Sequence, residues 1–81
     1  MQVIILFKKQ SNYEFFYRNK VLCLELVKNF KNIKFLNFYD ENNINVPKKY
    51  QKYFFRVKKL KDLNNFFLKS KKHICISFIK K

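Results

Sequence analysis

The stretch that decides the fold is VIILF at residues 3–7, an unbroken apolar run near the start of the chain that ends in Lys8-Lys9. A short apolar run that begins with β-branched residues predicts a strand buried in a sheet. Ser11 or Asn12 can cap a helix after this strand, and Glu14 would then lie in the first turn. We therefore expect the chain to begin with a buried strand followed by a helix.

The spacing of apolar residues further along the chain alternates between the helical and the strand period. Residues 12 to about 31 are predicted to form one amphipathic helix, because polar and apolar side chains fall on opposite sides of a helical wheel. Residues 40–47 are rich in asparagine and contain the lone proline, which is typical of a loop. Further strands are predicted at 33–39, 53–57 and 74–78, and a short helix at about 59–69.

This order of elements, β-α-β-β-α-β, predicts an α+β fold of the ferredoxin-like kind. Such a fold has a four-stranded antiparallel sheet with two helices on one face. The 81 residues are enough for a single small domain, 1–81, with a loop at about 40–52. The composition, 48% hydrophobic and 20% aromatic, favours a folded core over a disordered chain.

The charge of the chain is strongly positive, with 19 Lys and Arg against 5 Asp and Glu and a net charge of +14. A polyanion relieves the self-repulsion of such a chain, and RNA is the first candidate, ahead of an acidic membrane surface. Lys, Asn, Ile, Phe and Tyr dominate the sequence, which is typical of a very AT-rich gene. We therefore expect a mitochondrial protein made in the organelle, with a plastid-type organelle or the cytoplasm of an AT-rich bacterium as alternatives.

Residue types that catalysis requires are scarce. The only histidine, His73, has no acidic neighbour in sequence to orient it. Cys23 and Cys75 fall in apolar stretches and are expected to be reduced core thiols, with a disulfide or a shared metal as the alternative. The chain contains no glycine, which excludes a glycine-rich phosphate loop. We expect no enzymatic activity, no cofactor, no metal and no small-molecule substrate.

Cations alternate with aromatic rings directly after the predicted loop, in the stretch KKYQKY at residues 48–53. Lysines contact phosphates, and aromatic rings stack on unpaired bases. Any single lysine cluster is equally compatible with a solvated face, but several clusters with few acids between them favour a binding surface. The candidate RNA-binding residues are Lys48, Lys49, Tyr50, Lys52, Arg56, Lys58, Lys59, Lys71, Lys72 and His73.

The second half of the chain resembles the family of small-subunit ribosomal protein S ten. VPKK at 46–49 resembles the end of that family's long β-loop, and KYFFRV at 52–57 resembles the strand after it. KD at 61–62 resembles the start of the family's short helix, and SKKHICISFI at 70–79 resembles its last strand. The first half is similar in the order and length of its elements only, and the family's Ser-Pro-His and Gly-Pro-Ile-Pro motifs are replaced here.

The resemblance implies a structural constituent of the small ribosomal subunit, in its head region. Its implied partners are ribosomal RNA and the neighbouring head proteins of the S three, S nine and S fourteen families, with no membrane involved. The alternative function is a small accessory subunit of an organellar respiratory membrane complex, because an aromatic amphipathic helix such as the one expected from Asn12 can lie on a lipid or protein surface. A different RNA-binding protein on the same fold is a third possibility.

Overall fold

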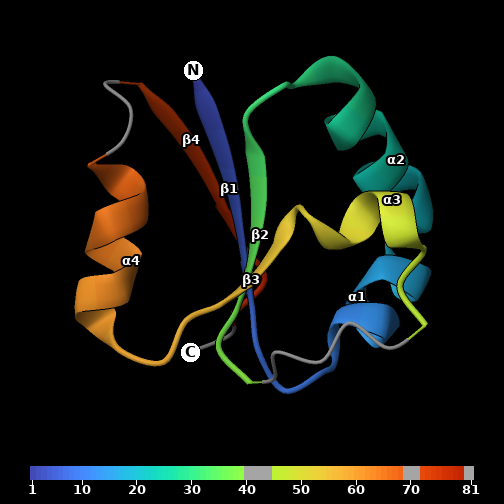
Figure 1. Ribbon diagram of the computed structural model, residues 1–81, viewed down its shortest axis with the longest axis horizontal. Coiled ribbons are helices and arrows are strands. Elements are labelled where there is room, and N and C mark those ends of the chain that lie inside the picture. The colour runs from blue at the N-terminus through green and yellow to red at the C-terminus, as the bar shows by residue number, and fades with distance from the viewer. Residues whose placement is uncertain (40–44, 69–71, 80–81) are drawn as a thin grey trace.

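The computed structural model describes residues 1–39, 45–68 and 72–79, which form a sheet with helices on both of its faces (Figure 1). The elements in chain order are β1 (Gln2–Phe7), α1 (Asn12–Arg18), α2 (Lys20–Asn29), β2 (Ile33–Asn37), α3 (Lys48–Gln51), β3 (Phe54–Arg56), α4 (Leu60–Phe67) and β4 (His73–Ser77). Each strand and each longer helix lies close to a position that the apolar spacing predicts.

The four strands are all parallel and lie in the order β3-β2-β1-β4. The expected ferredoxin-like antiparallel sheet is therefore wrong. The error lies in the connection between β2 and β3, which the sequence suggested was a loop between antiparallel strands. This connection contains α3 and is long enough to return the chain to the start of the sheet, as a parallel crossover requires. The chain is a succession of strand–helix–strand units.

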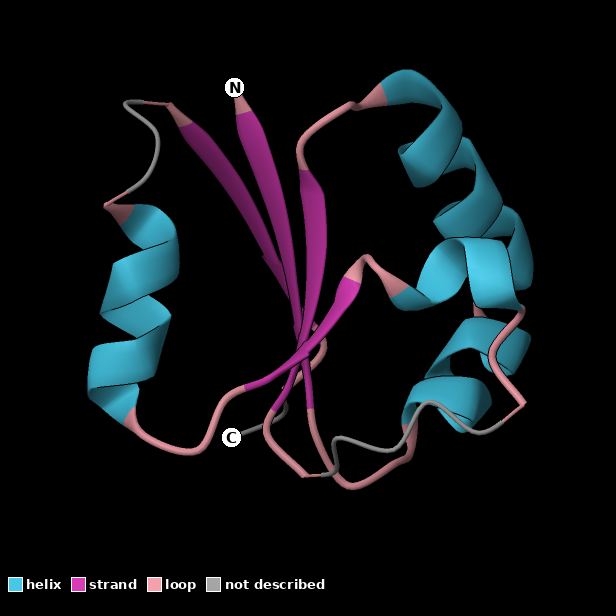
Figure 2. Ribbon diagram, in the orientation of Figure 1, coloured by secondary structure: helices cyan, strands magenta, loops and turns pink. Residues whose placement is uncertain are grey.

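Helices cover the two faces of the sheet unequally. The steps from β1 to β2 and from β2 to β3 place α1, α2 and α3 on one face, whereas the step from β3 to β4 places α4 on the other (Figures 1 and 2). Right-handed crossovers that step in opposite directions along a sheet put their helices on opposite faces. The expected pair of helices on one face is thus replaced by a doubly wound α/β arrangement, whose direction changes between β1 and β4.

The helix expected over residues 12–31 is divided into α1 and α2 at Asn19. The Asn19 backbone has φ −117° and ψ 33°, and its side-chain Nδ2 donates to the Phe15 carbonyl at 3.0 Å. The Asn19 backbone N–H donates to the same carbonyl at 3.0 Å, so the helical bond at Asn19 is kept and α1 ends where the φ and ψ of Asn19 leave the helical region. At the start of α1, the Ser11 hydroxyl accepts a hydrogen bond from the Glu14 N–H at 3.1 Å, which makes Ser11 the N-cap.

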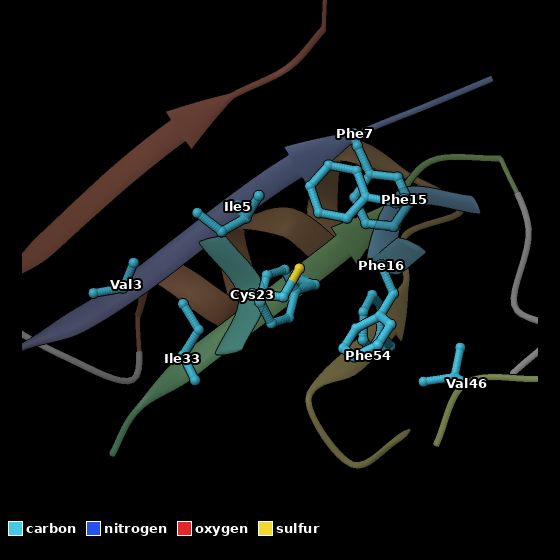
Figure 3. Packing of buried hydrophobic residues seen from close by; sticks show 10 residues of the cluster. Val3, Ile5, Phe7, Phe15, Phe16, Cys23, Ile33, Val46 and Phe54 are labelled. Carbon is cyan, nitrogen blue, oxygen red and sulfur yellow. The ribbon is translucent and has the colours of Figure 1, made fainter. Parts of the chain in front are cut away.

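The sheet packs on both of its faces, and β1 lies at its centre. Alternate residues of β1 face α1 and α2, where the Phe7 and Phe15 rings stack at 4.1 Å between centroids (Figure 3). On the opposite face Ile4 and Leu36 pack with side chains of α4. Five of the six residues of β1 are buried, which confirms the buried strand expected from residues 3–7.

The two cysteines are free and differ in environment. Cys23 of α2 is fully buried in the larger core cluster, as expected. Cys75 is exposed, so the expectation of a second core thiol is wrong. Its strand, β4, lies at the edge of the sheet, where the helices leave its side chains accessible.

Candidate nucleic-acid interface

The carboxyl ends of parallel strands meet at one edge of a sheet, and this edge gathers two lysine pairs. Lys8-Lys9 directly follow β1, and Lys58-Lys59 lie just beyond the end of β3. A hollow of about 180 Å³ opens beside the second pair, with Phe38 and Val57 as its apolar lining and Lys58 and Lys59 as its cations. We call this feature the carboxyl-edge hollow. An apolar lining with flanking cations suits a base or sugar carrying a phosphate.

Asn37 fixes the loops at this edge. It is the last residue of β2 and is fully buried, and its Nδ2 donates to Asn12 Oδ1 at 2.9 Å and to the Gln10 carbonyl at 3.2 Å. Its Oδ1 accepts a hydrogen bond from the Tyr39 N–H at 2.8 Å. A buried amide satisfied in this way holds the loops after β1 and β2 in one arrangement. Asn37 was not among the predicted site residues, although a polar residue at the end of an apolar strand is a signal that the sequence contains.

Lys8 and Lys9 were likewise not among the predicted site residues. Lys9 is exposed and has φ 64°, the left-handed region, which costs a residue with a Cβ atom about 1–2 kcal/mol. Lys8 is half-buried. The strands β1 and β3 are separated by β2, and the chain after β1 turns toward α1 on one face, whereas the chain after β3 turns toward α4 on the other (Figure 1). The two lysine pairs therefore share the carboxyl edge but leave it toward opposite faces of the sheet.

The segment with alternating lysines and tyrosines forms α3 and the turn after it. Its lysines Lys48, Lys49 and Lys52 are all exposed. Tyr50 is half-buried, with its ring 5.3 Å from that of Phe16 and the Lys49 Nζ 5.1 Å from its centroid. The ring of Tyr50, which was predicted to contact RNA, therefore packs α3 against α1. The lysines supply the accessible charge of this segment.

Arg56 lies at the end of β3, level with Asn37 of β2. Its side chain is half-buried, and its Nη1 is buried with no hydrogen-bond partner in the part of the chain that the structure describes. The predicted role of Arg56 as an RNA contact is thus limited to the part of the guanidinium that solvent reaches.

His73 belongs to a buried network at the amino edge of the sheet. The Gln2 side chain is fully buried, and its Nε2 donates to the Phe66 carbonyl at 2.8 Å and lies 3.2 Å from His73 Nδ1. The Lys34 amine donates to Gln2 Oε1 at 2.6 Å. The His73 ring also contacts Phe67, with 5.1 Å between centroids. These contacts give His73 a packing role between β1, β4 and α4.

The predicted residues therefore divide among three places. Lys48, Lys49, Tyr50 and Lys52 lie on or beside α3; Arg56, Lys58 and Lys59 lie at the carboxyl edge; Lys72 and His73 lie at the amino edge. Lys72 is exposed, and Lys71 lies outside the described residues. β3 and β4 are the two edge strands of the sheet, about 14 Å apart. The lysines near β3 and those near β4 therefore do not form one patch.

Among the described residues, no three His, Cys, Asp or Glu side chains are grouped to hold a metal ion. No described helix has the length and apolar character needed to cross a bilayer.

The fold and the edge define the chain as a small basic α/β domain of the doubly wound class. Comparison of the chain with protein-family models, curated proteins and solved structures finds no match.

Proposed function

We propose that this chain is an RNA-binding structural constituent of a ribonucleoprotein, the small ribosomal subunit, and that it performs no reaction. The observation that carries the proposal is the carboxyl-edge hollow, where Phe38 and Val57 lie beside Lys58 and Lys59. Ligands of open parallel sheets bind outside the carboxyl ends of the strands, typically at the switch point, which here lies between β1 and β4. The hollow lies instead at the carboxyl ends of β2 and β3, so its lining is what supports the proposal.

Electrostatics supports RNA as the ligand. Lys58 and Lys59 line the hollow, and Lys8-Lys9 lie at the same carboxyl edge of the sheet, within a chain whose net charge is +14. Each phosphate contact made by a lysine releases counterions, which makes binding strong at low salt and weak at high salt. An unpaired base that enters the hollow would meet Phe38, while its phosphates meet the lysines.

The particular ribonucleoprotein rests on the sequence resemblance alone. The stretches at 46–49, 52–57, 61–62 and 70–79 resemble small-subunit ribosomal protein S ten, whereas the parallel sheet differs from the fold which that resemblance implies. Residues 48–51 also form α3, where the resemblance implies the end of a long β-loop. The head of the subunit, the S three, S nine and S fourteen neighbours and the mitochondrial location remain parts of the proposal.

The binding test compares two charge removals of equal size. Lys58→Ala with Lys59→Ala removes two charges beside the hollow. Lys28→Ala with Lys31→Ala removes two exposed charges from the end of α2 and the turn before β2, at the opposite edge. The affinity for single-stranded RNA is measured against salt concentration, and the first variant should lower the slope by about 1.4, at ~0.7 per contact. Equal slopes in the two variants would refute the hollow as the RNA site.

The cellular test is sedimentation of the tagged native protein in a sucrose gradient, with RNA crosslinking of each fraction. The proposal expects the protein in the small-subunit peak, crosslinked to ribosomal RNA. Recovery with inner membranes at high salt and without RNA would instead favour the accessory subunit of a respiratory complex.

A further inference from the structure

Strand β4 is the least covered part of the sheet. Ile74, Ile76 and Phe78 are 40%, 38% and 39% exposed, and Cys75 and Ser77 on the other face are exposed as well. Parallel sheets are normally covered on both faces, as β1 is here. An apolar stripe along an uncovered parallel strand is a departure from that rule, and it indicates a surface that a partner covers.

The backbone of β4 has a second unused feature. The Phe78 N–H donates to the Leu6 carbonyl at 2.8 Å, and the Gln2 N–H donates to the Lys72 carbonyl at 2.9 Å. In a parallel ladder alternate residues face the same neighbour, so Ile74 and Ile76 also bond to β1. The N–H and C=O groups of Cys75 and Ser77 therefore point outward, at the free edge of the sheet. An edge of this kind is a template for the addition of another strand.

Charge decides which strand can be added. Lys69, Lys71 and Lys72 precede or open β4 in the sequence, and Lys80 and Lys81 follow it. A second copy of the chain, paired with β4 in either direction, would bring basic flanks together, and like charges across an interface oppose pairing. A strand with acidic flanks gains attraction at both ends instead. RNA has neither a β backbone to continue the ladder nor aliphatic side chains to extend the stripe.

We propose that β4 is a docking edge for an extended segment of another protein, one with alternating apolar side chains and acidic residues at its ends. The segment continues the sheet through the outward N–H and C=O groups of Cys75 and Ser77, and its apolar side chains extend the stripe of Ile74, Ile76 and Phe78. This inference is independent of RNA binding, because it uses the edge of β4 rather than the carboxyl-edge hollow.

The test titrates the full chain with a labelled synthetic peptide of about nine residues, made of alternating valine and threonine with aspartates at both ends. Amide hydrogen exchange is measured in parallel. We expect the peptide to bind and to slow exchange at Cys75 and Ser77 more than at Ile74 and Ile76. A peptide N-methylated on the donors that face β4 should bind at least about tenfold more weakly. A peptide with lysines in place of the aspartates should also bind more weakly.

A protein variant gives a matched check. Cys75→Pro removes an outward N–H and leaves the bonds to β1 intact, which proline at a sheet edge allows. This variant should bind the aspartate peptide as weakly as the natural chain binds the N-methylated peptide. No binding by the aspartate peptide, or equal binding by its N-methylated or lysine form, would overturn the proposal. If the chain alone forms a dimer that Cys75→Pro dissociates, the occupant of the edge is a second copy and the proposal is overturned. If RNA slows exchange at Cys75 and Ser77, the occupant is RNA and the proposal is likewise overturned.

Discussion

Replacement of Gln2 by leucine should destabilise the protein because Gln2 joins three elements to β1. Its side chain bonds the Phe66 carbonyl of α4 at 2.8 Å and the Lys34 amine of β2 at 2.6 Å, and it lies 3.2 Å from His73 Nδ1 of β4. Two neutral bonds at about 1 kcal/mol and one charged bond at about 2 kcal/mol are lost. The apolar gain of a buried leucine offsets about 1 kcal/mol. We expect a net loss of about 3 kcal/mol.

A loss of this size is a large part of the stability of an 81-residue chain, for which about 4–12 kcal/mol is typical. Urea unfolding followed by circular dichroism should show a midpoint lower by about 2–3 M. Gln10→Leu is the matched control, because the Gln10 Oε1 is buried without a hydrogen-bond partner in the described part of the chain. That variant should be neutral or stabilising. Similar midpoints for the two variants would refute the network described for Gln2.

Three further predictions follow from backbone geometry and thiol burial. Burial raises the pKa of the Cys23 thiol from 9.0 to about 12, so the unfolded chain ionises first, and stability should fall as the pH rises from 9 to 12. Urea unfolding should show a smaller fall in Cys23→Ala, and an equal fall in both proteins would contradict the assignment. An aromatic disulfide reagent should label Cys75 in the native protein and Cys23 only after unfolding, so rapid native labelling of both would exclude the buried position of Cys23. Lys9→Gly relieves a φ of 64° and should raise stability by up to about 1 kcal/mol while it weakens RNA binding. Lys9→Asn tolerates the same φ without the charge, and unchanged RNA affinity in both variants would remove Lys9 from the interface.

The positions of the strands and longer helices were predictable because the apolar period changes clearly along the chain. The run at residues 3–7 is β1, and the alternation at 74–78 marks β4. The break at Asn19 was not predictable from the period, since both α1 and α2 keep apolar residues on one side. It depends on the backbone angles of Asn19, φ −117° and ψ 33°, which the apolar period does not report.

The predicted antiparallel direction of the strands was wrong, and there are two physical reasons for the error. A helix of four residues such as α3 is too short to have a readable period, so the connection between β2 and β3 resembled a loop. The run at residues 3–7 lacks alternation, which is typical of a strand buried on both faces and therefore of a parallel sheet. That property was visible in the sequence, and it favours the observed fold over a sheet with helices on one face only.

The candidate site was only partly predictable because sequence neighbours separate along a strand. Lys52 lies at the end of α3, before β3, whereas Lys58 lies beyond the other end of β3. Lys8-Lys9 and Lys58-Lys59 are distant in sequence, yet the parallel order brings both pairs to one edge. Charge clusters therefore led to the expectation of a polyanionic ligand, whereas the residues that lie together depend on the direction of the strands.

Binding and stability are coupled in a chain this small and this basic. A ligand that binds only the folded protein stabilises it by about 2.7 kcal/mol at one hundred times its dissociation constant. That gain is close to the loss of about 3 kcal/mol expected for Gln2→Leu, whose network lies at the amino edge, away from the carboxyl-edge hollow. Saturating RNA should therefore restore the unfolding midpoint of Gln2→Leu nearly to that of the unliganded natural chain. RNA that instead binds the unfolded chain by charge alone would leave the midpoint unchanged or lower it, and the coupling measures how much of the binding depends on the folded edge.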